Sequence, residues 1–524
     1  MSNHGFDAII IGGGHNGLVA ATYLGKGGLR PLVLDKNAVI GGMCTTQEFP
    51  GMPPGFKFNV GCLIPAGIRG PITEELELES RFGLEWLDVD PSFWLPFPDG
   101  KFWRPWKDPQ KLVEEIRRVA RDHDADAFVK FSEYFGGLGM LVGSMYFGEP
   151  PSFKDLVGLL PDGLEGTELV RTLLMSANHV VDEWFDTDYL KGPIVKFVGS
   201  AGIDARDQAS GFLTSFFTTL AREGPAKGGA GSVTQALAKA AGAAGADIRL
   251  NTVVDKILVE NGQAVGVRLQ GGEEIRAKVV ISTLDAVRVF TQLLDPNLVE
   301  ERLLRRLRAL RADRYGCFYL HLALNELPDY SAKFPGYGPE LASSAVIICP
   351  STTYNDAFQS SINDGRIPEH PVFWGETPSV ADPSLAPAGK YTMTIGVYAA
   401  NELADGRSWD EARETLADNI VNELAAYAPN IKKAIIARHS ETPPEMVEHY
   451  GALDGNLGHL DFKLSQLLMF RPLPELANYR TPIANLYLSG AGTHPMGTVI
   501  GIPGFNTAHA VLKDLGAGTT QSSS

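Results

Sequence analysis

The sequence predicts an α/β protein whose central domain is Rossmann-like and is assembled from discontinuous segments of the chain. Three observations support this prediction. A short apolar strand runs into a glycine-rich turn near the N-terminus, a similar texture returns near residue 228, and a further apolar strand ends in glycines near residue 490. The stretches between them mix helical and strand patterns, which indicates an α+β lobe. The 524 residues exceed what one hydrophobic core usually supports, so two lobes are expected.

The first segment has the order strand, turn, helix, strand. Phe6–Ile11 is a short apolar run typical of a buried parallel strand, and it leads into the glycine-rich turn Gly12–Gly17. A helical pattern follows and ends at Gly27, and a second strand, Pro31–Leu34, ends on Asp35. This order predicts the beginning of a dinucleotide-binding βαβ unit.

The turn has the spacing Gly12-x-Gly14-x-x-Gly17, and each glycine has its own physical purpose. The first permits the tight turn, the second lets the backbone approach a pyrophosphate, and the third lets helix and strand pack closely. The pyrophosphate would lie on free N–H groups at the helix N-terminus. Asp35 follows Gly12 by 23 residues, close to the spacing of about 20 expected for a ribose-binding carboxylate. That carboxylate disfavours a 2′-phosphate, so NADP is not expected here.

A second glycine pair distinguishes FAD from NAD. Gly41-Gly42-Met43-Cys44 lies just after the second strand, where it would let the chain pass close to the flavin end of an extended dinucleotide. In dithiol reductases a related Gly-Gly pair precedes two cysteines separated by four residues. Here Phe49 stands at the partner position of Cys44, which excludes a redox disulfide beside the flavin. We therefore expect Cys44 to be a small packing residue next to bound FAD, and covalent attachment to the flavin is the less favoured alternative.

The middle of the chain contains both Rossmann-like patterns and the mixed patterns of a separate lobe. Residues 51–220, with Trp, Phe and Pro clustered between Trp86 and Trp106, indicate a separate and partly helical lobe. The Rossmann-like texture returns at Gly228–Gly231, before a predicted helix and the strand Asp247–Leu250. Alternating runs up to Ile281, with Asn-Gly and Gly-Gly turns between them, predict a three-stranded meander. Residues 300–450 again resemble an inserted lobe.

The C-terminal region completes the predicted domain. The strand Leu486–Leu488 ends in Ser489-Gly490-Ala491-Gly492-Thr493-His494-Pro495, and a final helix is expected from about Phe505 to Leu515. The predicted FAD-binding domain therefore comprises 1–75, 222–298 and 450–516, and the substrate-binding lobe comprises 76–221 and 299–449. Residues 517–524 are rich in Gly, Thr and Ser and are expected to be a disordered tail.

Three histidines are candidates for chemistry or binding. His494 follows the C-terminal glycines and is the one candidate catalytic residue, either as proton carrier or as substrate contact; the competing interpretation is that it only shapes the loop. His459 is a second candidate on the substrate side, although a structural role is favoured. His15 lies inside the phosphate turn, where contact with the cofactor is expected. The sequence contains no metal-binding signature and no HExxH, P-loop or GxSxG motif.

Composition narrows the partners and the compartment. The net charge of -16 makes nucleic acid an unlikely partner. Four cysteines without CxxC spacing are expected to be reduced thiols, which fits the cytoplasm, or the mitochondrial matrix if the source is eukaryotic. No signal peptide or spanning segment is predicted, so membrane contact is at most peripheral. Tyr134–Phe147 could dip into an interface, but a core helix is the favoured interpretation. The sequence leaves open whether the chain forms a homo-oligomer.

These motifs resemble those of the phytoene desaturase-like flavoproteins, within the wider amine oxidase and GDP-dissociation-inhibitor superfamily. The resemblance is strongest at the two ends, in Ile9–Gly17, Val33–Thr46 and Gly455–Ala510, and it is closest to the branch named for a pyridine nucleotide-disulphide oxidoreductase domain. It implies a GR2-type FAD-binding domain and a substrate tunnel for long apolar molecules. One departure concerns Met496–Val499, where the family often has a further glycine run, and it leaves the flavin-face contacts undefined.

The resemblance also implies roles for individual residues. Asp35 would hold the adenosine ribose and Val254 the adenine through its backbone, while Gly42, Gly492 and the turn Gly501–Phe505 would line the isoalloxazine. Together with the motifs, the candidate cofactor-binding residues are Gly12, Gly13, Gly14, His15, Asn16, Gly17, Asp35, Lys36, Gly41, Gly42, Met43, Cys44, Val254, Gly492, Gly501, Ile502 and Phe505.

Three functions remain open at this point. The leading hypothesis is an FAD-dependent dehydrogenase, desaturase or oxidase, in which an apolar or aromatic small molecule delivers hydride to flavin N5 and oxygen or a quinone reoxidises the flavin. The second is an FAD-dependent isomerase without net redox change. The third is a non-enzymatic prenyl- or lipid-binding regulator of the GDP-dissociation-inhibitor type.

Overall fold

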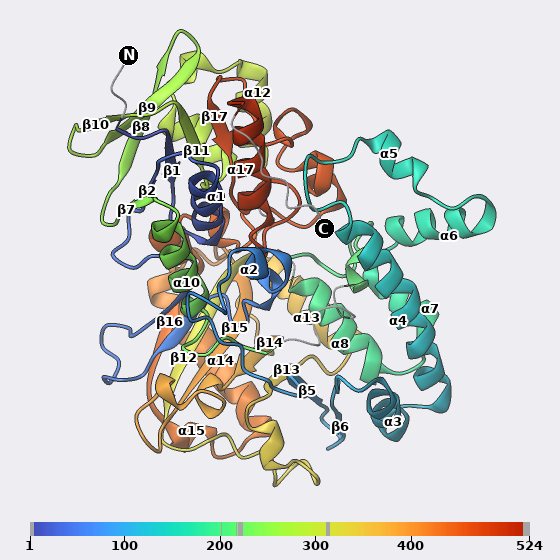
Figure 1. Ribbon diagram of the computed structural model, residues 1–524. Helices are drawn as coiled ribbons and strands as arrows, with labels where there is room; N and C mark the ends of the chain where they lie inside the picture. Colours follow the sequence, from blue (N-terminus) through green and yellow to red (C-terminus); the bar gives the residue numbers. More distant parts are fainter. Residues whose placement is uncertain (1–4, 201, 216, 218–223, 311–314, 517–524) are drawn as a thin grey trace.

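The computed structural model describes residues 5–200, 202–215, 217, 224–310 and 315–516, and a parallel sheet lies at the centre of one half (Figure 1). Its five strands have the order β17-β11-β1-β2-β7 and every neighbouring pair is parallel. The strands come from distant parts of the chain: β1 (Ala8–Ile11), β2 (Pro31–Leu34), β7 (Asp247–Arg249), β11 (Val279–Ser282) and β17 (Leu486–Leu488). This confirms the predicted Rossmann-like α/β fold built from discontinuous segments.

Three helices pack together on the parallel sheet because their small and apolar residues face it. They are α1 (His15–Lys26), α10 (Gly231–Ala243) and α17 (Ile502–Asp514), and they share one hydrophobic cluster with β1 and β11. Gly504 of α17 lies against α1, where an added Cβ would be 2.2 Å from the Asn16 carbonyl oxygen. Close approach of these two helices therefore depends on glycine.

An antiparallel meander covers the opposite face of the parallel sheet. It consists of β8 (Val254–Glu260), β9 (Gln263–Leu269) and β10 (Glu274–Arg276), and it shares a cluster with Ile9 and Leu32. The sequence prediction of one long third strand up to Ile281 is wrong. The chain leaves the meander at Ala277 and enters the parallel sheet as β11, whose residues are all buried, so the alternation there has no exposed face.

A seven-stranded mixed sheet forms the core of the other half, in the order β16-β12-β15-β14-β13-β5-β6. Its strands come from two stretches of the chain: β5 (Phe93–Pro96), β6 (Phe102–Trp103), β12 (Tyr315–Leu324), β13 (Ala345–Ile348), β14 (Phe373–Glu376), β15 (Tyr391–Ala400) and β16 (Ile435–Glu441). The helices that pack on this sheet are α13 (Thr352–Asn363), α14 (Trp409–Tyr427), α15 (Ile431–Ala434) and α16 (Pro443–Tyr450). Two further helices, α11 (Ala286–Arg288) and α12 (Glu301–Arg308), pack instead in the hydrophobic cluster of the parallel sheet and the meander. Because β13 pairs with β5, the two stretches form one lobe.

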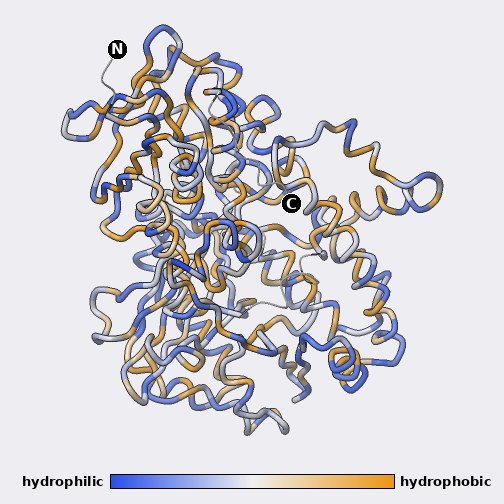
Figure 2. The backbone as a smooth tube through the Cα atoms, in the orientation of Figure 1, coloured by the Kyte–Doolittle hydropathy of each residue, from blue (hydrophilic) through white to orange (hydrophobic). Residues whose placement is uncertain are grey.

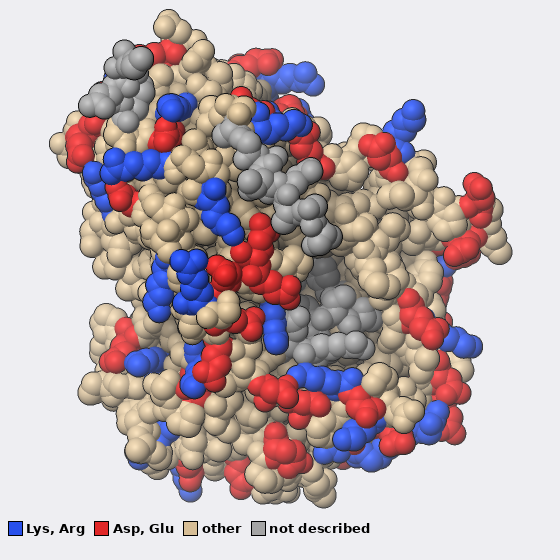
Figure 3. Space-filling model, in the orientation of Figure 1, with Lys and Arg blue, Asp and Glu red and all other residues tan. Residues whose placement is uncertain are grey.

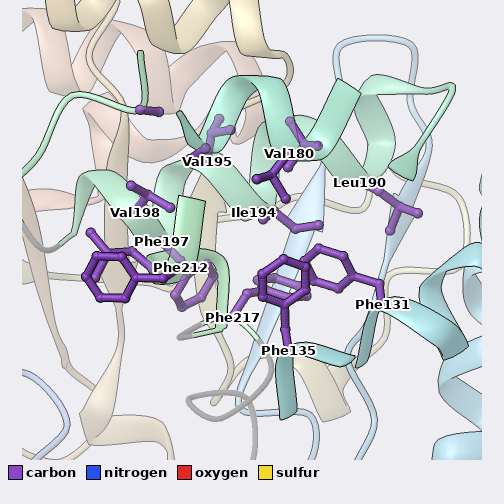
Figure 4. Packing of buried hydrophobic residues seen from close by; sticks show 14 of the residues in the cluster. Phe131, Phe135, Val180, Leu190, Ile194, Val195, Phe197, Val198, Phe212 and Phe217 are labelled. Atoms are coloured by element: carbon purple, nitrogen blue, oxygen red, sulfur yellow. The ribbon is translucent and has the colours of Figure 1, made fainter. Parts of the chain in front are cut away.

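A helical region extends from β6 and packs through aromatic residues. It comprises α3 (Pro109–Val119), α4 (Asp122–Gly143), α5 (Phe153–Gly158), α6 (Gly163–Leu174), α7 (Ala177–Trp184) and α8 (Asp188–Gly199). Phe131 and Phe135 of α4 are fully buried beside Leu190 and Ile194 of α8 (Figure 4). The segment suspected of membrane contact thus contributes one face to this core. In the part of the chain that the structure describes, no helix is both long and apolar enough to span a bilayer.

Smaller elements join the two halves. The hairpin of β3 (Cys44–Gln47) and β4 (Phe58–Gly61) follows the second glycine pair, and α2 (Pro71–Glu75) comes next. The Tyr319 hydroxyl on β12 donates to the Gly61 carbonyl at 2.6 Å, which connects the mixed sheet to this hairpin. On the face shown in Figure 3, acidic and basic side chains are interspersed. Residues 517–524, predicted to be a disordered tail, lie outside the described residues.

Candidate functional site

A cavity of about 920 Å³ lies between the parallel sheet and the mixed sheet. One wall is made by the glycine-rich turn, the end of β2, the second glycine pair and residues near 497. The facing wall is made by residues of α8, α13, β14 and β15. The cavity therefore runs from the carboxyl ends of the parallel strands, where such sheets bind dinucleotides, into the lobe with the mixed sheet.

The glycine-rich turn has the geometry that a pyrophosphate requires. Gly12 has a φ of 102°, and its N–H donates to the Leu34 carbonyl at 2.8 Å. Gly14 is the N-cap of α1, with no side chain capping the helix. A Cβ added to Gly14 would meet no protein atom closer than 3.9 Å, because the position opens into the cavity. The unblocked N-terminus of α1 can thus receive an anion directly.

Asp35 stabilises the turn and also faces the cavity. One carboxylate oxygen accepts from the Gly13 N–H at 2.7 Å, and the other accepts from the Asn37 N–H at 2.8 Å. Burial raises the pKa of Asp35, and these two backbone N–H groups oppose that shift. A carboxylate has about four acceptor positions, so two remain for the hydroxyls of a ribose. Thr252, Val253 and Val254 line the cavity beside it, where the adenine is expected.

The second glycine pair lies directly against the first turn. Gly41 has a φ of 127° and its N–H donates to the Gly13 carbonyl at 3.0 Å. Gly42 has a φ of 61° and packs against Gly14, and both glycines line the cavity. Cys44 is buried, and its thiol donates to the Ala230 carbonyl at 3.3 Å. All four cysteines are free in the structure, and Cys62 is one of those that line the cavity.

Three unpaired polar atoms near the turn test whether a flavin nucleotide fits. His15 Nε2, Asn16 Oδ1 and His459 Nδ1 are buried without a hydrogen-bond partner, and all three side chains line the cavity. Burial lowers the pKa of His15 to about 4 and that of His459 to about 3, so both imidazoles are neutral near pH 7. Buried polar atoms are normally paired, so these groups match a ligand rich in nitrogen and oxygen. The residues present fit FAD.

The sequence patterns did not reveal a basic group at the end of the cavity near Asp35. Arg288 follows β11 and lines the cavity near Lys36. Burial lowers the pKa of Lys36, and the Arg288 charge adds to that effect. The Lys36 ammonium donates to the Glu448 carbonyl. No motif marks Arg288, since its position depends on how the β11–α11 connection crosses the sheet edge.

The structure places the candidate cofactor residues in two groups. Those that line the cavity are Gly12, Gly14, His15, Asn16, Asp35, Lys36, Gly41, Gly42, Met43, Cys44 and Val254. Those outside the lining are Gly13, Gly17, Gly492, Gly501, Ile502 and Phe505. Gly13 and Gly17 support the turn from behind, since a Cβ on Gly17 would lie 2.1 Å from the Gly12 carbonyl oxygen. The C-terminal wall is instead formed by Ala491 and residues 496–500.

His494 lies behind this C-terminal wall and is not among the residues that line the cavity. It is fully buried, and its Nε2 donates to the Met145 carbonyl at 3.1 Å. Burial lowers the pKa of His494 to about 4, so the ring is neutral. Tyr479 donates to the His494 carbonyl at 3.3 Å. These contacts connect the loop to the end of α4.

Comparisons with known proteins agree with this geometry. A family model described as flavin containing amine oxidoreductase matches residues 17–504. A rat protein called pyridine nucleotide-disulfide oxidoreductase domain-containing protein 2 is 30% identical, over 97% of this chain and 94% of its own length. A neurosporene-forming phytoene desaturase of Cereibacter sphaeroides is 27% identical, over 95% and 92%. The structure of putrescine oxidase bound to putrescine has a TM-score of 0.61 at 14% identity, with 98% and 99% of the chains covered.

Proposed function

Because the chain belongs to the flavin-containing amine oxidoreductase family and is an FAD-dependent oxidoreductase, we propose that its cavity dehydrogenates an apolar or aromatic small molecule. Membership of this family confirms the resemblance to the phytoene desaturase-like flavoproteins. Membership of an oxidoreductase family also argues against a non-enzymatic prenyl- or lipid-binding regulator. We assign residues 1–75, 222–298 and 450–516 to cofactor binding and residues 76–221 and 299–449 to substrate binding.

The observation that carries the proposal is the continuity of the cavity. The same space that meets the Gly12–Gly17 turn extends to an apolar wall formed by Phe197, Phe358, Val372 and Val397. When bound, FAD supplies a two-electron acceptor that takes a hydride from a substrate C–H at N5 and passes electrons on to oxygen or a quinone. A substrate held against the apolar wall would thus meet the cofactor inside one continuous cavity.

The residues that line the cavity favour positioning over acid–base catalysis. His15 and His459 are neutral, with the pKa lowered to about 4 and about 3 respectively, which makes both of them weak bases at pH 7. Tyr319 and Tyr398 have pKa values raised well above the usual range by burial, so their hydroxyls stay protonated. Their contribution is to exclude water and orient the substrate. We assign His494 a loop-shaping role.

The visible spectrum of the purified protein tests the proposal. We expect a yellow protein that releases FAD on denaturation, whose flavin bands bleach when an oxidisable substrate is added without oxygen and return when oxygen or a quinone is admitted. A colourless protein would overturn the proposal. Anaerobic addition of NADH and NADPH shows whether nicotinamides can reduce the flavin. Product formed at full rate with no electron acceptor present would instead support an FAD-dependent isomerase.

Peripheral contact with a lipid surface is a second part of the proposal. The α5–α6 arm, residues 147–174, projects from the helical region (Figure 1). Hydropathy colouring places hydrophobic residues along it (Figure 2). No residue of α5 is buried, and Phe153 and Leu164 are 61% and 76% exposed. Tyr146, just before the arm, lines the cavity, so a substrate dissolved in lipid would have a short route to it. Free thiols fit the cytoplasm or the mitochondrial matrix.

A further inference from the structure

A lysine lies buried in the apolar wall of the cavity. Lys196 is on α8, in the stretch Gly192–Gly199, where every other residue is uncharged and buried. Its neighbours Val195, Phe197 and Val198 pack among Phe212 and Phe217 of the helical region (Figure 4). Lys196 is only 7% exposed, yet it lines the cavity. An ammonium group in such a place is unusual, because burying a charge is costly unless an opposite charge compensates it.

The structure supplies no anion to this lysine. Among the described residues, no carboxylate lies within 4.0 Å of the Lys196 ammonium. Its hydrogen-bond partner is the Ser200 hydroxyl, at 2.7 Å. The ammonium also lies 5.1 Å from the centre of the Trp374 indole and 5.2 Å from that of the Phe197 ring. Aromatic faces attract a cation but leave its charge uncompensated.

Neighbouring polar atoms on the same wall also have no partner. Both amide atoms of Asn355, the Gln359 Oε1 and the Trp374 Nε1 are buried without a hydrogen bond, and all three side chains line the cavity. Asn355 and Gln359 are one helical turn apart on α13, which packs on α8. An added Cβ on Gly199 of α8 would lie 3.1 Å from the Gln359 amide nitrogen, so the two helices present these groups together. Buried atoms of this kind are almost always satisfied, here by something that enters the cavity.

We propose that Lys196, Asn355, Gln359 and Trp374 form a binding site for the carboxylate of a substrate whose remaining body is apolar. Lys196, the Asn355 amide and the Trp374 indole offer N–H donors to carboxylate oxygens. One ammonium balances the single charge of a carboxylate, whereas a phosphate would leave negative charge buried. The Gln359 side-chain oxygen can accept a hydrogen bond from a donor group of the substrate that lies next to its carboxylate. This inference rests on the proposed function, since it treats the cavity as the substrate chamber, and it narrows the substrate class to an apolar acid.

Binding of matched acid and amide probes tests the site without requiring turnover. The probes are decanoate with decanamide, and phenylacetate with phenylacetamide, titrated calorimetrically into the FAD-loaded protein. We expect at least one acid to bind more tightly than its amide by about 10- to 100-fold, the range of hydrogen bonds to charged groups. Lys196→Met should remove this preference, and Lys196→Arg should keep part of it. Asn355→Leu should reduce it.

Lys191→Met is the matched control. It removes the same charge from the same helix, at a position whose ammonium is 2.8 Å from Asp182 and which is absent from the cavity lining. The preference for acids should be unchanged in this variant. Flavin content and circular dichroism establish that each variant is folded. If no acid binds better than its amide, or if Lys196→Met keeps the preference, the carboxylate site is refuted. The proposed oxidoreductase would still stand if the flavin is bleached by a neutral substrate.

Discussion

At the scale of single residues, the glycines of the turn fall into two physical classes. Gly17 faces the protein, where an added Cβ would lie 2.1 Å from the Gly12 carbonyl oxygen. Gly14 faces the cavity, and its φ of -70° and ψ of 174° suit any residue. The same motif therefore contains one glycine that the fold requires and another that the cofactor requires.

Alanine substitutions should separate the two classes. Gly17→Ala is expected to lower the melting temperature of the apoprotein, because backbone atoms must move to make room. Gly14→Ala should leave that temperature almost unchanged and weaken FAD binding by about tenfold or more, since the methyl group occupies ligand space. Fluorescence titration with FAD measures the affinity. The control is Gly242→Ala on α10, which has open space around it and should stabilise the helix by about 1 kcal/mol. Normal FAD affinity in Gly14→Ala would contradict the assignment.

The buried Lys196 ammonium should make the stability of the folded protein depend on pH, in a direction that its pKa shift determines. Burial lowers the pKa of Lys196 to about 8 from its ordinary value of 10.5. Between these values the unfolded chain holds a proton that the folded chain has lost, so wild-type stability should rise with pH relative to Lys196→Met. The neighbouring Cys349 thiol stays neutral, because burial raises its pKa. Melting temperatures of both proteins, compared from about pH 7 to about pH 10, check this. A constant difference would show that the lysine is not titrating in the buried state.

At the scale of elements, the sequence predicts best where one local pattern decides the structure. The strands β2 and β17 begin and end where the apolar runs predict, and the glycine turn, α1 and Asp35 follow in the expected order. Prediction is poorer where tertiary contacts decide. Residues 275–281 alternate throughout, yet they divide between two sheets because the chain crosses from one to the other at Ala277.

Local sequence patterns are also insufficient to predict which residues line the site. Gly492 and Gly501 have the residue type that a flavin wall favours, but the folded loop places residues 496–500 in the cavity lining instead. Nothing local to Arg288 or Lys196 indicates a site. Arg288 reaches the cavity through the path of the β11–α11 connection, and Lys196 reaches it because α8 packs against α13. Such residues are found only once the distant segments have been brought together.

The α5–α6 arm carries a prediction at the same scale. Replacing Phe153, Leu159 and Leu164 by Ser should abolish co-flotation with phosphatidylcholine vesicles, because these exposed side chains supply the apolar contact. The fold should be unaffected, since the three side chains are 61%, 49% and 76% exposed. Replacing Leu298 and Ile436 by Ser removes exposed apolar residues that lie outside the arm, and should leave flotation intact. The arm has no lipid-binding role if the wild-type protein fails to float or the arm variant floats equally well.

At the scale of the whole molecule, the cavity connects segments that are far apart in the chain. Its lining includes residues of the parallel-sheet half, such as Gly12 and Thr283, and of the mixed-sheet half, such as Cys317 and Gly396. The hydroxyl of Tyr319 also connects the mixed sheet to the hairpin that follows the second glycine pair. A ligand that fills this space contacts both halves, so its binding energy stabilises their association as well as each half alone.

Removing FAD should therefore destabilise the protein as a unit. Restoring FAD at about 100 times its dissociation constant is expected to add about 2.7 kcal/mol to the free energy of unfolding. ADP should give a smaller increase, because it reaches only the part of the cavity near Asp35. NADP should give almost none, since its 2′-phosphate would meet that buried carboxylate. Calorimetry of the apoprotein with each ligand measures these differences. If two transitions appear and only one moves with FAD, the halves unfold independently, and the cofactor does not couple them.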